Sequence, residues 1–594
     1  MRYSNSEISE ILKKVALALE IKGEQFFRIR AYKDAAQNSD HFSGSIYGYW
    51  QEGKLEEVPG IGTSIAQHLA EYFDKGKSKH FDSLMKDIPD VVFELDNVPG
   101  IGAKTAMKLV EELNISSFND VLDAAKLGKI AVVEGLGKKS QEKIKYSVEG
   151  YLAKQEKDER MLLYKADIII ESFLAAIPKN TVITKIIPVG SVRRRVPTVG
   201  DFDFAIETDN PTEVEKLFEN HPDIVSISSK GEFKITLNHR EGYRIDILME
   251  TASSFPSLLQ HFTGSKAHNV LLRKKANNMG YSLSEHGIKL LSSEGKEGSD
   301  QIVLVGSEEE LYELLKLQYI PPELREGTDE IELAEKGQIP GIISLSDVRG
   351  DLHVHSNFDV EPSHDLGENT VEDIAHKAHA RGYSYIGIAD HNPAIGTHTE
   401  DEVLAIIKKR KDHIEHINTI IDYIEVINCM EVDILADKSI AVSGSSLEHL
   451  TFVIAGIHSG HNQKKEQIME RLKMAIIHPH VHMISHPTGR LINERESYEA
   501  DWDEIFELCQ KHHTILEINS APQRLDLPDF LVKQAKEHNV KFCIDTDSHA
   551  VETLTFMRYG VDVARRGWCT LEDIVNTWSW EKIVDYLREG GKKI

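Results

Sequence analysis

The sequence predicts a chain of three parts: a helical N-terminal part, a central α+β part and a C-terminal α/β part with parallel strands. Three observations lead to this prediction. Residues 1–150 carry apolar side chains at intervals of three and four, with short glycine turns between them. Residues 160–320 mix helical segments with short apolar strands. After residue 350, short apolar strands alternate with helices, which is typical of a barrel of parallel strands.

Length and composition exclude several classes of protein. A chain of 594 residues has room for about four domains of roughly 150 residues each. Its hydrophobic (41%) and charged (28%) fractions are those of a folded chain and not of a disordered one. No run of 18 apolar residues is present, so we expect no membrane span. The first residues favour an amphipathic helix over a signal peptide, and four cysteines without a C-x-x-C pair favour a reducing, cytoplasmic location.

Charge and histidine are unevenly distributed along the chain. The net charge is −27, which would argue against a nucleic-acid partner, but residues 1–150 contribute only −3 of it. Twenty of the 28 histidines and all four cysteines follow residue 350. The sequence therefore leaves DNA binding open for the N-terminal part and predicts metal ligands in the C-terminal part.

A glycine-rich turn is repeated in the helical part. The pattern V-P-G-I-G occurs at residues 58–62 and again at 98–102, and a looser copy spans residues 134–139. Each turn precedes a helix (63–73 and 103–113 for the first two), whose free N–H groups and dipole favour a phosphate. A helix corner without a ligand is the alternative. Two copies beside basic residues favour sequence-independent binding of a DNA backbone, with Gly60, Gly62, Gly100, Gly102 and Lys104 as candidates. These segments resemble helix-hairpin-helix motifs.

Three carboxylates in the central part predict a metal site. In a strand, residues two apart face the same side, so Asp201 and Asp203 project together. Asp246 lies on a later strand between isoleucines, and three carboxylates at one sheet edge would repel each other unless divalent metal ions separated them. Two Mg²⁺ ions in such a site support in-line phosphoryl transfer. An exposed strand face is the alternative interpretation, but Gly190, Ser191 and Arg194 upstream could hold a triphosphate.

The strands of the two later parts are predicted from short apolar runs. In the central part they are residues 186–189, 202–206, 233–237 and 243–249. In the C-terminal part they are residues 385–390, 424–435, 452–459, 482–487, 515–520 and 541–549. Residues 321–350 contain proline, glycine and charged residues, and they are predicted to be a linker.

The central motifs resemble those of family X DNA polymerases, the group of polymerase beta. The resemblance is carried by GSVRRRVPTVGDFDF (190–204), RIDIL (244–248) and HFTGSKAHNVLLR (261–273), and it covers roughly residues 1–325. It implies that Asp201 and Asp203 bind both metals and that Asp246 binds the catalytic metal and accepts the primer 3′-hydroxyl proton. It also implies contacts to the nucleotide or the DNA by Ser191, Arg194, Gly200, Phe262, Gly264, Asn269 and Arg273.

The sequence departs from this family at four positions. His261 and Lys266 replace a tyrosine and an aspartate near the sugar and base, so sugar discrimination is not predicted. His68 stands where polymerase beta has its Schiff-base lysine, and Ser64 replaces another lysine. Because histidine forms no stable Schiff base, deoxyribose-phosphate lyase activity is not carried over.

The C-terminal part places potential metal ligands at the ends of its apolar strands. In a barrel these ends converge on one face. Mixed histidine and carboxylate ligands suit Zn²⁺, Mn²⁺ or Fe²⁺, and eight or nine of them would serve two or three ions. The candidates are His353, His355, His391, Glu431, His458, His486, Asp547 and His549.

This set resembles the PHP (polymerase and histidinol phosphatase) domain from Asp351 through His549. The family commonly has a Ser-Asp-Gly after its H-x-H, and here the sequence is HSNFDVEPSH. Asp359 is our choice for that ligand, with Glu361 and His364 as rivals.

The order of domains resembles bacterial and archaeal family X polymerases with a C-terminal PHP domain. The implied fold is a helix-hairpin-helix region, an α+β nucleotidyltransferase palm with thumb, and a TIM-like PHP barrel. The expected boundaries are 1–85 and 86–155 (helical), 156–255 (palm), 256–320 (thumb), 321–349 (linker) and 350–594 (PHP).

The implied activities are gap-filling synthesis in DNA repair and a metal-dependent 3′–5′ exonuclease, with abasic-site cleavage allowed. The implied partners are gapped or primed DNA and deoxynucleoside triphosphates. The implied ions are Mg²⁺ or Mn²⁺ in the polymerase site and two or three Mn²⁺ or Zn²⁺ ions in the PHP site. Two alternatives remain: a PHP domain that is a scaffold or a small-molecule phosphatase, and a gap-binding module without catalysis. We expect a monomer.

Overall fold

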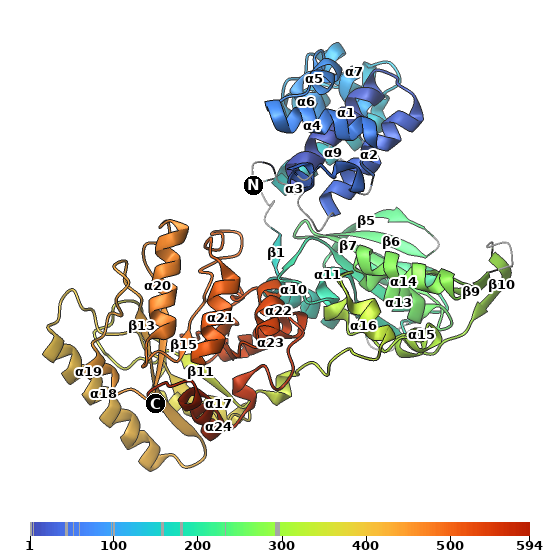
Figure 1. The fold of residues 1–594 in the computed structure, drawn as a ribbon. Coiled ribbons are helices and arrows are strands. Elements are labelled where there is room, and N and C mark those ends of the chain that lie inside the picture. Colours follow the sequence, from blue (N-terminus) through green and yellow to red (C-terminus); the bar gives the residue numbers. More distant parts are fainter. Residues whose placement is uncertain are drawn as a thin grey trace. The chain divides into compact units, whose positions relative to one another are not determined.

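The structure is a computed structural model in which the chain forms two compact units, residues 1–159 and 160–594 (Figure 1). It describes residues 3, 5–41, 46–51, 53–58, 60–96, 98, 101–155, 160–178, 182–231, 233–291 and 297–594. Within these ranges, no helix has both the length and the hydrophobicity needed to cross a membrane.

The first unit is helical, as predicted. Its helices are α1 (Asn5–Ile21), α2 (Phe26–His41), α3 (Ile46–Gln51), α4 (Thr63–Lys75), α5 (Lys79–Met85), α6 (Asp90–Asp96), α7 (Ala103–Leu113), α8 (Phe118–Lys126) and α9 (Lys138–Gln155). Helices α4 and α7 begin directly after the two V-P-G-I-G segments. Apolar side chains from most of these helices form one buried core.

The three glycine turns share one backbone pattern. The N–H of Ile61 donates to the carbonyl of Val58 at 3.0 Å, and Ile101 donates to Val98 at the same distance. In the looser third copy, Leu136 donates to Val133 at 2.9 Å. The third segment is therefore a turn of the same kind, although its sequence has diverged.

The second unit begins with a five-stranded sheet in the region predicted as the palm. The sheet consists of β2 (Lys185–Pro188), β4 (Phe202–Glu207), β7 (Arg244–Glu250), β6 (Lys234–His239) and β5 (Ile224–Lys230), in that spatial order. β4 and β7 are parallel, whereas the other pairs are antiparallel. α10 (Leu163–Ala175) and α12 (Pro211–Glu219) pack on it, and the rings of Phe173, Phe204 and Phe218 meet in the core. The sequence missed β5.

The region predicted as the thumb contains three helices and a small antiparallel sheet. The elements are α13 (Phe255–Thr263), α14 (Lys266–Asn278), β8 (Tyr281–Ser284), β9 (Gly287–Leu291), β10 (Glu297–Val303) and α15 (Glu308–Leu314). The predicted linker that follows is packed against its surroundings. It contains α16 (Glu330–Glu335), and its side chains Leu324, Ile339 and Ile343 are buried.

The last part is a nearly closed barrel of seven parallel strands, which confirms the predicted TIM-like fold. The strands follow their sequence order: β11 (Gly350–Val354), β12 (Tyr385–Ile388), β13 (Glu425–Asp433), β14 (Phe452–Gly456), β15 (Met483–Ile484), β16 (Ile515–Asn519) and β17 (Phe542–Asp545). A parallel bridge between Val354 and Ser548 brings the first and last strands together. The outer helices are α17 (Val371–Ala380), α18 (Glu400–Ile420), α19 (Gly444–Leu447), α20 (Lys465–Ile477), α21 (Trp502–His512), α22 (Asp529–Glu537), α23 (Met557–Arg566) and α24 (Trp580–Glu589) (Figure 1).

A buried arginine ties α18 to the barrel strands beneath it. Arg410 is 1% exposed, and its guanidinium donates to the Asp390 carboxylate at 2.8 Å and to the Ile388 carbonyl at 2.7 Å. Asp390 in turn accepts a hydrogen bond from the Ser356 N–H, just after the H-x-H segment. The arginine therefore supports the strand end that carries two candidate metal ligands.

We predict that Arg410→Met destabilises the chain by about 3–5 kcal/mol, because it leaves the Asp390 carboxylate buried without its cation. Thermal or urea unfolding followed by circular dichroism would measure the loss. Lys408→Met on the exposed side of the same helix is the matched control, with an expected change within about 0.5 kcal/mol. Equal stability of the two variants would contradict the role given to Arg410.

Candidate functional site

The structure brings the three predicted polymerase carboxylates to one sheet edge. Asp203 on β4 and Asp246 on β7 are directly paired residues of adjacent parallel strands. Asp201 lies immediately before β4. Parallel strands with matched register place these side chains next to each other, as the alternating pattern predicts.

The electrostatics of this edge are those of crowded like charges. Burial, together with the neighbouring Asp201 and Asp246 carboxylates, raises the pKa of Asp203 to about 7. Burial also acts to raise the pKa of Asp246, but contacts with cations and a hydroxyl hold it below its usual value. Lys234 Nζ lies 2.8 Å from its Oδ2, and Thr236 Oγ1 donates to its Oδ1 at 2.7 Å. Lys234 and Arg244 lower the pKa of Asp203 less than burial and the two carboxylates raise it, and a divalent metal ion would add positive charge there, so the donor set fits Mg²⁺ or Mn²⁺.

The candidate triphosphate turn packs directly against Asp203. Gly190 opens α11 (Gly190–Arg193) at φ +66°, a conformation that favours glycine. A Cβ at this position would lie 3.2 Å from Asp203 Oδ2. The turn and the carboxylate can approach this closely only because residue 190 has no side chain, and Ser191 follows at the same end of α11.

Arg194 lies at the end of this turn and is engaged by other residues of the chain. Its Nη1 donates to the Thr263 carbonyl at 2.6 Å, and its Nε lies 3.3 Å from Glu326 Oε1. A Cβ on Gly264 would lie 3.1 Å from Arg194 Nη1, so the guanidinium is next to the end of α13 that carries Phe262. The sequence-predicted nucleotide residues 190, 191, 194, 262 and 264 therefore lie in connected elements.

The remaining residues of the central part that are predicted to contact the nucleotide or the DNA are Asn269, Arg273 and Gly200. Asn269 is buried on α14, where its amide accepts from Gln260 at 2.8 Å and donates to the His261 carbonyl at 2.7 Å. Arg273 is exposed on the same helix, and Gly200 is exposed just before Asp201. The amide of Asn269 is thus already bonded within the protein.

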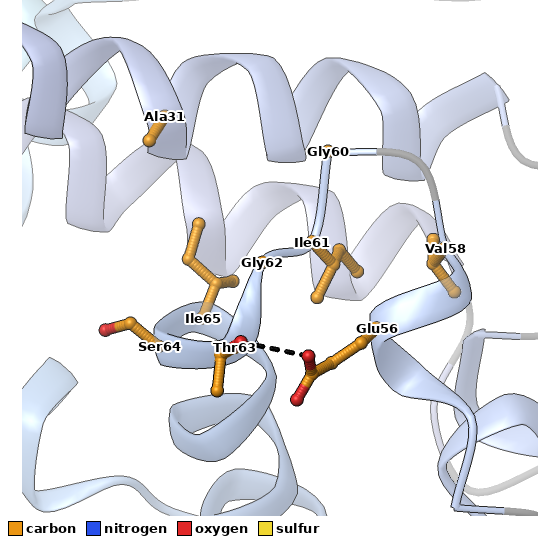
Figure 2. Close-up of a pocket in the computed structure, with 9 residues that line it drawn as sticks. All are labelled: Ala31, Glu56, Val58, Gly60, Ile61, Gly62, Thr63, Ser64 and Ile65. Atoms are coloured by element: carbon orange, nitrogen blue, oxygen red, sulfur yellow. Dashed lines mark hydrogen bonds between the residues drawn. The ribbon is translucent and has the colours of Figure 1, made fainter.

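The first glycine hairpin borders a hollow of about 660 Å³ (Figure 2). Its lining consists of Ala31, Glu56, Val58, Gly60, Ile61, Gly62, Thr63, Ser64 and Ile65. Gly62 precedes α4 and Gly102 precedes α7, and neither glycine has a side chain that could cap its helix. At the start of α7 the Asp96 carboxylate bonds the Ala103 N–H. Among the described residues no such carboxylate bonds the backbone at the start of α4, which therefore presents its N–H groups, and Lys104 is exposed beside the start of α7. Gly100 lies outside the described residues.

At the position of the family's Schiff-base lysine, the structure has two stacked imidazoles. The ring centroids of His68 and His80 are 4.1 Å apart. Arg28 Nη2 lies 3.0 Å from His80 Nε2. This cluster offers ring nitrogens and a guanidinium but no amine nucleophile.

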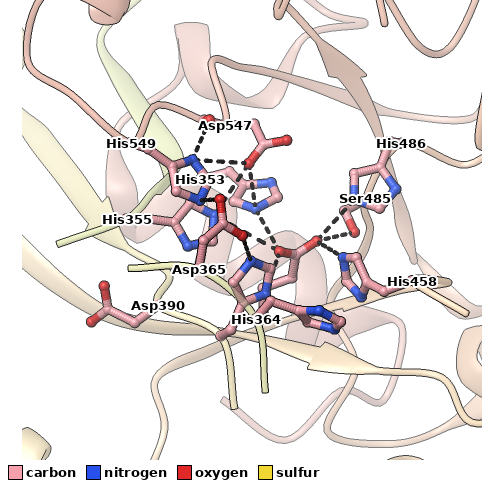
Figure 3. A network of polar contacts seen from close by, with 12 residues as sticks. His353, His355, His364, Asp365, Asp390, His458, Ser485, His486, Asp547 and His549 are labelled. Carbon is pink, nitrogen blue, oxygen red and sulfur yellow. Dashed lines mark hydrogen bonds and ion pairs between the residues drawn. The ribbon is translucent and has the colours of Figure 1, made fainter. Parts of the chain in front are cut away.

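The predicted C-terminal ligands converge at the carboxyl ends of the barrel strands (Figure 3). Glu431 on β13 is at the centre of the set. Its Oε2 lies 3.2 Å from His353 Nε2 and 3.1 Å from His391 Nδ1. Its Oε1 lies 3.1 Å from His458 Nε2 and 3.0 Å from His486 Nε2. Four imidazoles, from the ends of β11, β12, β14 and β15, therefore meet the one carboxylate of β13.

Asp547 forms a second centre in the same cluster. Its Oδ1 lies 3.2 Å from His355 Nε2 and 3.6 Å from His353 Nε2. His549 stacks on His355 with ring centroids 4.1 Å apart. All eight strand-end candidates are thus within one connected group, and ligand atoms of His353, His355, Glu431 and Asp547 lie within 4.8 Å of one another.

Unsatisfied buried atoms show that this cluster fits metal ions. Among the described residues, six buried nitrogen and oxygen atoms of the cluster make no well-aligned hydrogen bond, although four of them lie 3.1–3.2 Å from another candidate ligand atom: His353 Nε2, His355 Nδ1, His355 Nε2, His391 Nδ1, Glu431 Oε2 and His549 Nε2. Buried polar atoms without partners are costly, and bound cations would satisfy most of these atoms at once. The mixed imidazole and carboxylate set suits Mn²⁺ or Zn²⁺.

The protonation states also suit metal binding. Burial alone would raise the pKa of Glu431, but His458, His353 and His391 hold it well below its usual value. Burial lowers the pKa of His391 to about 2 against the opposing effect of Glu431, so this ring is neutral. His458 differs, because Glu431 and Asp433 overcome burial and raise its pKa to about 10. A metal ion bound to this ring would take the place of that proton.

Asp359, the ligand predicted after the H-x-H segment, stays a prediction. Among the described residues, the groups of clustered ligand atoms include neither Asp359, whose carboxylate accepts from the Glu361 N–H at 2.9 Å, nor Asp365. The Asp365 carboxylate is a second candidate, with oxygens 3.8 Å from His391 Nε2 and 3.5 Å from His549 Nε2. The segment S-H-D-L-G (363–367) is an interrupted Ser-Asp-Gly, which is the signal that could have identified Asp365.

Other residues of the site were missed by the sequence. Glu517 on β16 accepts from His353 Nδ1 at 2.6 Å, which directs Nε2 of that ring into the cluster. Asp433 lies 2.7 Å from His458 Nδ1 and 3.0 Å from His364 Nε2, so His364, a rival candidate, is at the edge of the cluster. The alternating pattern of ILEINS predicted the strand but not the partner of its glutamate.

We predict that Glu517→Gln weakens Mn²⁺ binding by about 10- to 100-fold, because a neutral amide orients and polarises His353 less well than a carboxylate does. Isothermal titration with Mn²⁺ on the full chain would measure it. Glu415→Gln on the exposed face of α18 is the control and should leave the affinity unchanged. Equal affinity in both variants would remove Glu517 from the metal site.

Four family profiles match the chain in the order of its parts. They are a helix-hairpin-helix domain (residues 3–78), a SAM-like helix-hairpin-helix tandem (92–147), the DNA polymerase beta thumb (258–326) and the PHP domain (351–521). Asp547 and His549 lie beyond the last match, where the structure nevertheless joins them to the cluster.

Two relatives show how far the similarity extends. The chain is 32% identical over 584 residues to the "DNA polymerase/3′-5′ exonuclease PolX" of Bacillus subtilis (strain 168), covering 98% of this chain and 99% of that protein. It is 25% identical over 353 residues to DNA polymerase lambda of Rattus norvegicus, covering 54% of this chain and 56% of that protein. The first match spans every part of the chain from the hairpins to the barrel, and the chain belongs to the family X DNA polymerases that carry a C-terminal PHP domain.

Proposed function

We propose that this chain is a DNA-directed DNA polymerase that fills short gaps during repair, and that its PHP barrel is a metal-dependent 3′–5′ exonuclease. The observation that carries the proposal is the presence of two separate clusters of candidate metal ligands in one chain. The carboxylate edge adjoins a turn suited to a triphosphate, and the barrel holds a buried histidine and carboxylate cluster. The Bacillus subtilis relative is named for both activities.

In the polymerase site, the protein binds and orients the reacting groups. Asp201, Asp203 and Asp246 hold Mg²⁺ or Mn²⁺, which would lower the pKa of the primer hydroxyl and neutralise the triphosphate. Asp246 is kept anionic by Lys234 and accepts the proton of the primer 3′-hydroxyl. The backbone at Gly190, the Ser191 hydroxyl and the Arg194 guanidinium bind the triphosphate, and the residues at 262, 264, 269 and 273 contact the sugar, base pair and template.

In the barrel, the strand-end ligands hold two or three Mn²⁺ or Zn²⁺ ions. Bound metal would activate a water and clamp the terminal phosphodiester. The protein keeps the ligand rings in position through Glu517, which bonds His353, and through Ser485, whose hydroxyl donates to Glu431 at 2.7 Å. Asp365, with a side chain 78% exposed, lies at the open side of the cluster, where DNA would enter.

The helical unit supplies binding to DNA without reading its sequence. The backbone N–H groups at the start of α4, and those that follow Ala103 at the start of α7, contact phosphates, and Lys104 adds positive charge. Gapped or primed DNA and deoxynucleoside triphosphates are the substrates, and we propose that the enzyme acts as a monomer in the cytoplasm.

We predict that Asp201→Ala combined with Asp203→Ala abolishes primer extension on gapped DNA while leaving exonuclease activity within about twofold of the parent, because only the polymerase metals lose their ligands. His353→Ala should show the converse pattern. Primer extension and degradation assays with Mg²⁺ and with Mn²⁺ would measure both activities, and Asp209→Ala, an exposed carboxylate after β4, is the control. Full synthesis by the double variant would refute the carboxylate assignment. Degradation of a small phosphomonoester but not of DNA would make the barrel a phosphatase instead.

We predict that Gly62→Asp weakens binding to gapped DNA by roughly tenfold at low salt, because the new carboxylate would cap the α4 N–H groups and repel a phosphate there. The position tolerates the change, since Gly62 has ordinary extended angles and nothing lies within 4 Å of a Cβ. Gly62→Ala is the matched control, with affinity close to that of the parent. Fluorescence anisotropy would measure both, and unchanged affinity of the aspartate variant would place the phosphate elsewhere.

A further inference from the structure

One helix of the barrel domain contacts the triphosphate turn of the polymerase. α23 follows the last barrel strand, and its side chains reach Arg194 and Arg195 at the end of that turn. Arg566 Nη1 donates to the Arg194 carbonyl at 2.9 Å. The Asp562 carboxylate accepts from Arg195 Nε at 2.8 Å. The turn is therefore held from the barrel side by one backbone contact and one ion pair.

Glu326 makes the Arg566 contact relevant to nucleotide binding. The Glu326 carboxylate oxygen Oε1 lies 3.3 Å from Arg194 Nε and 2.8 Å from Arg566 Nη1. The same glutamate is thus shared between the arginine assigned to the triphosphate and an arginine of the barrel domain. Arg566 is itself 8% exposed and is anchored by Asp529 at 2.7 Å. The Glu326 carboxylate and a phosphate compete for the Arg194 guanidinium. Because Arg566 also binds that carboxylate, it weakens the competition with the phosphate.

Arg195 shows that the turn needs support from outside the palm. Its backbone has φ +55°, in the left-handed region that few residues other than glycine adopt. Its guanidinium makes two bonds of 2.8 Å to the Asp167 carboxylate of α10 and a third to Asp562 of α23. The conformation that ends the turn is therefore held between a palm helix and a barrel helix.

We propose that α23 completes the nucleotide site of the polymerase, with Arg566 and Asp562 as positioning residues. Arg566 binds Glu326, which leaves Arg194 available to the triphosphate, and it fixes the Arg194 backbone. Asp562 holds Arg195 and so maintains the turn that presents Ser191. This inference rests on the proposed assignment of Arg194 to the triphosphate, and its test separates the two.

The test is single-nucleotide incorporation on gapped DNA by the full chain, with KM for the nucleotide and kcat measured separately. We expect Arg566→Ala to raise KM about tenfold and to change kcat less than about threefold, because a charge-assisted contact is lost and Glu326 then binds Arg194 alone. Adding Glu326→Gln to Arg566→Ala should bring KM back to within about threefold of the parent, whereas damage to the fold alone would not be rescued by a second change. Glu326→Gln by itself should lower KM.

Controls make each outcome decisive. Lys533→Ala removes another ion pair between the barrel and the preceding segment, with Asp329 at 2.6 Å, and should leave KM unchanged. Exonuclease activity of each preparation reports that the barrel is folded. If Arg194→Ala leaves KM unchanged, the proposed nucleotide site is wrong. If Arg194→Ala raises KM but Arg566→Ala does not, or if Glu326→Gln neither rescues the Arg566→Ala variant nor lowers KM alone, the inference is overturned.

Discussion

Negative charge gathered at the ends of parallel strands is the constraint on which the rest of this structure depends. Asp203 and Asp246 are paired across β4 and β7, and Glu431 and Asp547 lie inside the barrel. Like charges this close are unfavourable unless cations balance them. The palm provides Lys234 for Asp246, and the barrel surrounds Glu431 with imidazoles. In the palm, the raised pKa of Asp203 shows that the negative charge is not fully balanced, and a metal ion could balance it. In the barrel, ring nitrogens without a well-aligned hydrogen bond have lone pairs that could bind metal ions.

The sequence could indicate which candidate ligands at strand ends lie together, but not which loop residue lies beside them, for a physical reason. A strand has a period of two, and parallel strands end on the same face, so Asp203, Glu431 and His458 could be assigned from their place in an apolar run. A loop has no such period. Asp359 and Asp365 both follow the H-x-H segment within ten residues, and only the path of the chain decides which one reaches His391 and His549.

Hydrogen-bond and ion-pair partners that lie far apart in the sequence could not be predicted either. Glu517 is 164 residues from His353, and nothing local marks it as the group that orients that ring. The contacts of the predicted linker could not be foreseen for the same reason. Its Glu323 and Glu326 bind Arg565 and Arg566 of the barrel. A charged residue that pairs across an interface is indistinguishable in sequence from one that faces water.

These pairs bear on how the two activities can be separated. Removing the barrel would leave Glu323 without Arg565, and it would leave Glu326 and Arg195 with only Arg194 and Asp167 as partners, in a region that is partly buried. A partly buried charge that loses its partner destabilises the fold by more than the intact ion pair stabilises it. A truncated polymerase would therefore differ from the intact one at its nucleotide turn. Loss of synthesis after truncation would therefore say nothing about the metal cluster of the barrel. Point substitutions within each site are the changes that leave the shared interface intact.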